Sequence, residues 1–265
     1  MKTAIITGAA SGIGKAIGKL FHKNGYRVVG IDRQSNTQLP FKIIQYDISQ
    51  CSENNNPMIQ AQLEIAQGGV DVLVNNAAVQ IVKPIEQVTD DDWETTLKTN
   101  VLAPFWLIRY LLPSLRRNRG CVVNIGSIHA RLTKADFSLY AVSKGALLTM
   151  TKALAVELAP QVRVNAILPA ATDTPMLRAG FLGKDDALAE LADYHPLGRL
   201  AAPEEIAQAV YFLASDQAGF ITGTALEIDG GIGSLLHDPE NFKSGSQARR
   251  LTPPFNTRRG NHGRA

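Results

Sequence analysis

Short apolar runs alternate with longer, helically patterned segments along most of the chain. The runs are rich in Val, Ile and Leu and are bounded by Gly, Asn or Asp, a pattern that predicts buried strands. The predicted strands are Thr3–Thr7, Arg27–Ile31, Phe41–Tyr46, Val70–Val74, Val122–Ile125, Val162–Ile167 and Ala225–Ile228. The helical segments between them lie at residues 13–24, 57–67, 91–117, 138–159 and 203–214.

The alternation of strands and helices predicts the architecture. Helical segments between successive strands favour a parallel sheet that is covered on both faces. We therefore expect an α/β protein with a doubly wound Rossmann fold, a parallel sheet of about seven strands and helices on both faces. Residues 1–236 are interpreted as a single dinucleotide-binding and catalytic domain. Residues 237–265 hold few apolar side chains, so they predict a disordered tail that is dispensable for chemistry.

The formal net charge of +3 is not spread evenly along the chain. Residues 237–265 carry six Lys or Arg and two acidic residues, a net of +4. Residues 1–236 therefore hold 21 basic and 22 acidic side chains and sum to −1. A basic tail of this kind would bind phosphates only weakly and in a salt-sensitive way, so nucleic acid is not the expected partner.

Signals for the membrane, for secretion and for metal binding are missing from the sequence. The longest apolar stretch, residues 101–115, is too short to span a bilayer and contains Pro104, Arg109 and Pro113. The N-terminus enters a strand pattern at once, without a signal-peptide layout. Two cysteines are too few for a disulfide framework or a multi-cysteine metal site. We expect a cytoplasmic protein with no metal and no membrane partner.

A glycine-rich turn joins the first predicted strand to the first predicted helix. Glycines let the backbone turn tightly and approach a pyrophosphate at the positive helix N-terminus. The spacing is G-x-x-x-G-x-G, and a purely structural turn is the alternative interpretation. The candidate cofactor-binding residues of the turn are Gly8, Ser11, Gly12, Ile13 and Gly14.

Asp32 follows the second predicted strand, 18 residues beyond Gly14. An acidic side chain at this place accepts hydrogen bonds from the adenosine ribose and repels the 2′-phosphate of NADP. Arg33 is the counter-argument, because an arginine beside this position can bind that phosphate. Ser11 also favours NAD, because it stands where a basic residue would favour NADP. The sequence therefore predicts NAD, with NADP less favoured.

Tyr140 and Lys144 lie at the start of the predicted helix 138–159. Their i, i+4 spacing places both on one helix face. A nearby ammonium favours the phenolate and is expected to lower the phenol pKa toward the range useful for acid–base catalysis. The pair alone occurs often by chance, but Ser127 lies thirteen residues before Tyr140, directly after a predicted strand.

With these residues in order, the sequence resembles the short-chain dehydrogenase/reductase family over about residues 2–233. The motifs that carry the resemblance are Thr7-Gly8-(x)3-Gly12-Ile13-Gly14, Asn75-Asn76-Ala77-Ala78, Asn100, Ser127, Tyr140-(x)3-Lys144, Pro169–Thr174 and Asp229-Gly230-Gly231. Two positions depart from the usual pattern, since Ala78 and Ala170 stand where the family commonly has Gly.

The resemblance implies a role for each of four catalytic residues. Tyr140 is the expected general acid in carbonyl reduction and general base in alcohol oxidation. Lys144 lowers the pKa of Tyr140 and binds the nicotinamide ribose. Ser127 polarises the substrate oxygen, and Asn100 holds a water that links Lys144 to solvent.

The resemblance also implies further cofactor contacts and an assembly. Asp47 and Ile48 are expected at the adenine, and Asn75 along the adenosine side. Thr172, through its backbone, and Thr174, through its hydroxyl, are expected at the carboxamide. A homo-oligomer, a tetramer or a dimer, follows from the resemblance and from apolar positions around more than one face of helix 91–117.

The substrate is expected to be a small alcohol or ketone, bound by residues 128–139 and 174–197, with 175–182 and 184–193 as a lid. His129, Arg131 and Lys134 either receive a substrate carboxylate or phosphate, or are solvated loop charges. His195 is interpreted as a packing residue. Two alternatives stay open: a 3-oxoacyl thioester reductase, and a dinucleotide-binding regulator with a nucleic-acid-binding tail.

Overall fold

The structure is a computed structural model that describes residues 1–53 and 69–236. All seven strands form one parallel sheet in the order β3-β2-β1-β4-β5-β6-β7, and helices flank it, so the predicted fold class is confirmed. The strands are β1 Thr3–Thr7, β2 Arg27–Asp32, β3 Lys42–Gln45, β4 Val72–Asn75, β5 Cys121–Ile125, β6 Arg163–Pro169 and β7 Ala225–Ile228. The helices are α1 Gly12–Lys23, α3 Asp90–Leu97, α4 Ala103–Arg117, α5 Ser138–Leu158, α6 Pro175–Gly180, α7 Asp185–Asp193 and α8 Pro203–Ala214.

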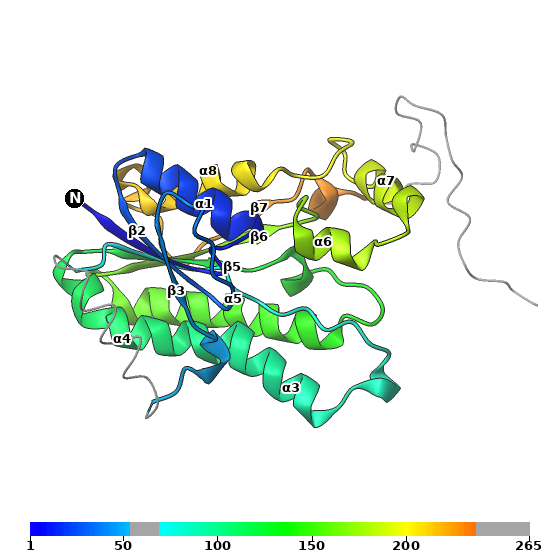
Figure 1. Cartoon of the computed structure of the whole chain (residues 1–265), viewed down its shortest axis with the longest axis horizontal. Coiled ribbons are helices and arrows are strands. Elements are labelled where there is room, and N and C mark those ends of the chain that lie inside the picture. The colour runs from blue at the N-terminus through cyan, green and yellow to red at the C-terminus, as the bar shows by residue number, and fades with distance from the viewer. Residues whose placement is uncertain (54–68, 237–265) are drawn as a thin grey trace, which may run out of the picture. The chain divides into compact units, whose positions relative to one another are not determined.

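The central strands are buried on both faces, which explains their nearly continuous apolar sequence. Along β1, Ile5 contributes to a core formed with α4 and α5, whereas Ala4 and Ile6 contribute to a second core formed with α1 and α8. Figure 1 shows the same division, with α1 and α8 on one side of the sheet and α4 and α5 on the other. Successive side chains of β1 therefore pack against the helices on opposite sides of the sheet.

The predicted helix 91–117 is helical throughout, but its hydrogen-bonding pattern changes in the middle. Thr89 caps α3 through a reciprocal pair of hydrogen bonds with Asp92, and α3 ends at Leu97. A π-helical turn, Lys98–Leu102, follows, and α4 then begins with Pro104 in its first turn. A proline that follows helical turns cannot donate a hydrogen bond to the preceding turn, and π-helical turns are common sites of such irregularity. The π-helical turn therefore lies directly before Pro104, where the sequence predicted a bend in one helix.

Other predicted bounds shift by a few residues. Strand β3 is shorter than the predicted run 41–46, and β4 runs from Val72 to Asn75 where 70–74 was predicted. The predicted helix 57–67 and the tail from residue 237 lie outside the described residues. Met1–Gly233 form one compact unit. Among the described helices, none has both the length and the apolar character needed to cross a bilayer.

Candidate active site

Most of the predicted site residues lie at the carboxyl edge of the sheet. Gly8 follows β1, Asp32 ends β2, Ser127 follows β5, and Thr172 follows β6. Strand order reverses between β1 and β4, the switch point where open parallel sheets leave a crevice for ligands. The sheet topology therefore brings together residues that are far apart in the sequence.

The glycine-rich turn has a geometry that requires its glycines. Gly8 and Gly12 have φ values of +66° and +51°, which side chains disfavour. A Cβ on Gly14 would stand 2.1 Å from the carbonyl oxygen of Gly8, so no side chain fits there. In the described structure Ser11 makes no side-chain capping bond, and the first turn of α1 holds no acidic residue. This N-terminus therefore fits a diphosphate.

The turn is also held from two sides by residues whose role there was not anticipated. Oδ2 of Asp32 accepts a hydrogen bond from the Ala10 backbone N–H at 3.0 Å, and Oδ1 accepts one from Gln34 N–H at 2.9 Å. The Asn76 side chain donates to the carbonyls of Thr7 and Gly8 at 2.9 and 3.2 Å. Asp32 therefore fixes the shape of the turn, besides standing where a ribose is expected.

The three residues predicted on the adenosine side differ in exposure. Asp47 is half-buried and accepts a hydrogen bond from Ser49 N–H at 2.9 Å, and Ile48 packs into the α4/α5 core. The Asn75 side chain is buried and donates to Asn124 Oδ1 at 2.8 Å. Asn75 Oδ1 has no hydrogen-bond partner among the described residues. Its side chain therefore belongs to the packing beneath the site, and the predicted contact would involve its backbone.

The four residues predicted as catalytic form one buried cluster. Tyr140 and Lys144 lie in the first two turns of α5, Ser127 lies at the end of β5, and Asn100 lies in the π-helical turn. The Lys144 amine donates to the Ile125 carbonyl at 2.8 Å and lies 5.5 Å from the centroid of the Tyr140 ring. The Ser127 side chain hydrogen-bonds the Tyr140 hydroxyl.

Asn100 is held by three hydrogen bonds. Its Oδ1 accepts from Val79 N–H at 2.9 Å, and its Nδ2 donates to the Val79 carbonyl at 2.9 Å and to Ser143 Oγ at 3.0 Å. Ser143 in turn donates to the Tyr140 carbonyl at 2.8 Å. Asn100 therefore links the loop after β4 to the start of α5.

The direction of the pKa shift at Tyr140 corrects a prediction. Burial raises the pKa of Tyr140 to about 12, and the hydrogen bond with Ser127 offsets only part of this. Burial also lowers the pKa of Lys144 to about 8. In the described structure the Lys144 amine bonds to a backbone carbonyl and not to the phenol. The expected lowering by Lys144 is therefore wrong for this structure.

The segment from Thr172 to Asp193 includes the predicted lid. Thr174 Oγ1 caps α6 by accepting a hydrogen bond from Leu177 N–H at 3.2 Å. The Thr174 side chain also lies close to Gly12, since a Cβ added at Gly12 would stand 3.3 Å from Thr174 Cγ2. Buried Thr172 pairs with Ala201 in an isolated bridge. The base of the lid therefore lies against the glycine-rich turn.

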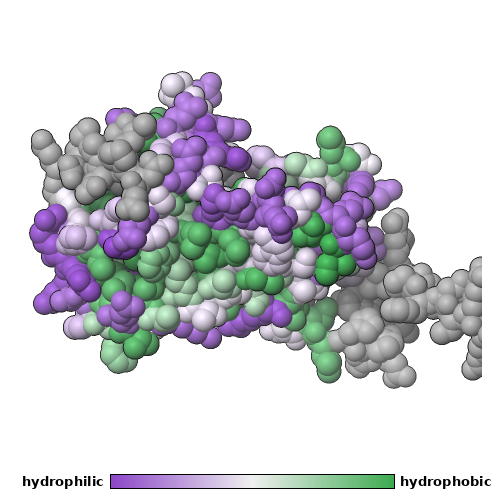
Figure 2. All heavy atoms as spheres, turned by 90° about the horizontal axis from the view of Figure 1, so that it is seen from below, coloured by the Kyte–Doolittle hydropathy of each residue, from purple (hydrophilic) through white to green (hydrophobic). Residues whose placement is uncertain are grey.

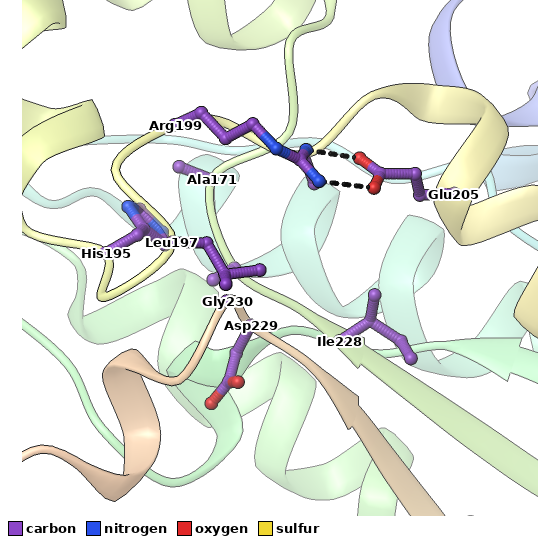
Figure 3. A pocket seen from close by; sticks show the side chains of 10 residues that line it. Ala171, His195, Leu197, Arg199, Glu205, Ile228, Asp229 and Gly230 are labelled. Atoms are coloured by element: carbon purple, nitrogen blue, oxygen red, sulfur yellow. Dashed lines mark hydrogen bonds and ion pairs between the residues drawn. The ribbon is translucent and has the colours of Figure 1, made fainter.

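A small cavity of about 60 Å³ lies between the segment after β6, the start of α8 and the end of β7 (Figure 3). His195 lines it and is 3% exposed; its Nδ1 donates to the Leu191 carbonyl at 2.9 Å. Its Nε2 is buried without a partner among the described residues. Figure 3 also shows Arg199 and Glu205 paired at the cavity wall. The packing interpretation of His195 agrees with this burial. Within residues 1–53 and 69–236, no group of acidic, His or Cys side chains could hold a metal ion.

Known proteins match this chain over nearly all of residues 1–236. A family model described as Enoyl-(Acyl carrier protein) reductase matches residues 8–233. An uncharacterized oxidoreductase of Thermotoga maritima is 37% identical over 246 residues, 87% of this chain and 95% of that protein. The ligand-free aldohexose dehydrogenase of Thermoplasma acidophilum has a TM-score of 0.84 at 32% identity, covering 89% of this chain and 95% of its own.

A second solved structure adds a bound cofactor. The 3-ketoacyl-(acyl-carrier-protein) reductase of Brucella melitensis, complexed with NADH, has a TM-score of 0.78 at 34% identity and covers 87% and 98% of the two chains. Fold and similarity together define an oxidoreductase of the Rossmann class. The chain belongs to the short-chain dehydrogenase/reductase family, a family of NAD(P)-dependent oxidoreductases.

Proposed function

We propose that the chain transfers a hydride between NAD(H) and the alcohol or carbonyl carbon of a small organic substrate, with Tyr140 as general acid and base. The observation that carries the proposal is the buried cluster of Tyr140, Lys144, Ser127 and Asn100 at the same sheet edge as the glycine-rich turn. When bound, the nicotinamide supplies or accepts the hydride. The protein supplies the proton transfer and holds the reacting oxygen.

The four side chains divide the proton chemistry. In alcohol oxidation the substrate hydroxyl loses its proton to the Tyr140 phenolate, and in reduction the Tyr140 phenol returns it. Ser127, which already hydrogen-bonds the phenol, donates to the same substrate oxygen. The Lys144 ammonium would bind the nicotinamide ribose. Asn100 would hold the water through which Lys144 exchanges protons with solvent.

The cofactor would lie along the carboxyl edge. Gly8, Ser11, Gly12, Ile13 and Gly14 would hold the diphosphate, and Asp32 the adenosine ribose. Asp47, Ile48 and Asn75 would surround the adenosine, and Thr172 and Thr174 the carboxamide. NAD is proposed over NADP, because the Asp32 carboxylate would repel a 2′-phosphate; exposed Arg33 is the feature that argues for NADP.

Reduction of 3-oxoacyl thioesters is the second candidate. It is favoured by the similarity to the 3-ketoacyl reductase of Brucella melitensis. The similarity to an aldohexose dehydrogenase favours small neutral alcohols instead. A regulator without turnover fits the chain less well, because the buried cluster is complete.

A homo-oligomer, a tetramer or a dimer, is also proposed. Four large apolar side chains on the π-helical turn, α4 and α5 are exposed, namely Leu102, Phe105, Val142 and Val156. Figure 2 looks onto the side of α3, α4 and α5 and shows apolar area among polar side chains. Association would cover this area. Light scattering that gives the mass of the 28.6 kDa monomer at micromolar concentration would contradict it.

The test of the function has two independent readouts. Quenching of protein fluorescence measures NADH binding, and absorbance measures NAD reduction with polyols, sugars, hydroxy acids, steroids and 3-hydroxyacyl thioesters. We expect submillimolar NADH binding and turnover of at least one neutral alcohol. Absence of NADH binding would reject NAD as the cofactor. Turnover confined to thioesters would favour the second candidate.

A further inference from the structure

His129 stands beside the proposed proton-transfer residue in an arrangement that catalysis alone does not explain. It lies in the 3₁₀ turn Ile128–Ala130, and its backbone N–H donates to Ser127 Oγ at 3.2 Å. Its ring meets the Tyr140 ring edge-on at 5.8 Å between centroids. The imidazole also stacks in parallel on the Phe137 ring, with 4.6 Å between the centroids. A small molecule that touches Tyr140 is therefore within reach of His129.

The two other basic side chains of this loop are already engaged. Arg131 forms an ion pair with Glu227 on β7. The Lys134 amine lies over the face of the Phe137 ring, 4.5 Å from its centroid, as a cation–π contact. A substrate carboxylate or phosphate would have to compete with both arrangements. Both cations of the loop are therefore engaged and not free to bind an anion. The polar group of the loop that remains near Tyr140 is the imidazole.

The imidazole itself is uncharged at neutral pH. Half-burial, with Lys134 nearby as a second cause, lowers the pKa of His129 to about 4. A neutral imidazole has one donor nitrogen and one acceptor nitrogen. Nδ1 is paired with the Thr133 hydroxyl at 3.2 Å, and Nε2 forms no hydrogen bond within the part of the chain that the structure describes. Nε2 is therefore available for one hydrogen bond to a ligand.

We infer that His129 is a specificity-determining residue that binds a second, uncharged oxygen of the substrate next to the reacting carbon. The substrate class is then a small vicinal diol, hydroxyketone or sugar, and not a hydroxy acid or a phosphate ester. This inference rests on the proposed function. The substrate spans the two rings, with its reacting oxygen at Tyr140 and Ser127 and its neighbouring oxygen at His129. Nothing in the inference changes the hydride or proton transfer at the reacting carbon.

The test compares substrates that differ in the second oxygen. The probes are cis-1,2-cyclohexanediol, cyclohexanol, which lacks the neighbouring hydroxyl, and 3-hydroxybutanoate, which carries a carboxylate. His129→Phe keeps an aromatic ring to stack on Phe137 and removes both ring nitrogens, the one paired with Thr133 and the one proposed to bind the substrate. His129→Gln restores a polar group. Lys134→Met is the matched control, because it removes a loop cation and leaves the imidazole in place. Thermal unfolding and NADH binding are measured for every variant.

We expect the wild type to prefer the diol over cyclohexanol in kcat/KM. His129→Phe should lower kcat/KM for the diol by about 10- to 100-fold and for cyclohexanol by less than about threefold. His129→Gln should recover part of the loss, and Lys134→Met should change neither substrate by more than about threefold. Equal losses on both alcohols would show a structural role and overturn the inference. So would a preference for 3-hydroxybutanoate that depends on Lys134. If no alcohol is turned over while NADH still binds, the proposed function is rejected, and the role of His129 with it.

Discussion

Replacement of Asn100 by Ala removes a side chain that joins two elements beside the reacting groups. Three hydrogen bonds are lost: two to the backbone of Val79 and one to Ser143 Oγ. Each net bond contributes about 0.5–1.5 kcal/mol, and the buried amide leaves a small void, so we expect the free energy of unfolding to fall by about 2–4 kcal/mol. Urea unfolding, followed by circular dichroism with an unchanged m-value, measures this loss.

Ser143→Ala is the matched control for Asn100→Ala. It removes the bond from Asn100 and the bond to the Tyr140 carbonyl but leaves both bonds of Val79 in place. We expect it to cost about half as much. A loss of less than about 1 kcal/mol for Asn100→Ala would refute the reasoning, because it would mean that water replaces the amide at the half-buried Val79 backbone without cost.

Three further predictions concern the cofactor turn and the buried amine. Gly14→Ala would place a Cβ 2.1 Å from the Gly8 carbonyl oxygen, so NADH affinity measured by fluorescence should fall at least about 100-fold; affinity within threefold of wild type would contradict the clash. Asp32→Asn keeps an oxygen for the Ala10 N–H but removes the charge, so the ratio of kcat/KM for NADP over NAD should rise about tenfold or more, and an unchanged ratio would remove Asp32 from cofactor choice. Because the pKa of Lys144 is lowered to about 8 in the folded chain, the unfolded chain binds more protons above that pH, and stability should rise with pH. Urea unfolding of wild type relative to Lys144→Met should show a gain of about 1 kcal/mol between pH 8 and pH 9; a flat difference would contradict the shifted pKa.

The sheet could be predicted from the sequence because its central strands are buried on both faces. The run Val122–Ile125 is apolar except for Asn124, and the glycine-rich turn marks the first crossover. The π-helical turn between α3 and α4 could not be predicted in this way. One extra residue in a π-helical turn leaves the apolar pattern of residues 91–117 nearly continuous, yet it sets where Asn100 points.

The features of the candidate site that the sequence did not predict depend on contacts between segments that are far apart in the chain. The hydrogen bond from Ala10 to Asp32 and the pairing of Asn75 with Asn124 depend on neighbouring strands that sequence spacing does not reveal. The pKa of Tyr140 was predicted from its charged neighbour alone. Burial of the phenol has the larger effect, and it depends on the whole fold.

Proton transfer by Tyr140 is the central claim, and Tyr140→Phe tests it most directly. The variant removes one hydroxyl and keeps the ring that packs against His129 and Phe137. Steady-state turnover with the best alcohol from the screen should fall by about 10²–10⁴-fold, while the NADH dissociation constant stays within about threefold. Turnover above a tenth of the wild-type rate, with NADH bound as before, would contradict the account.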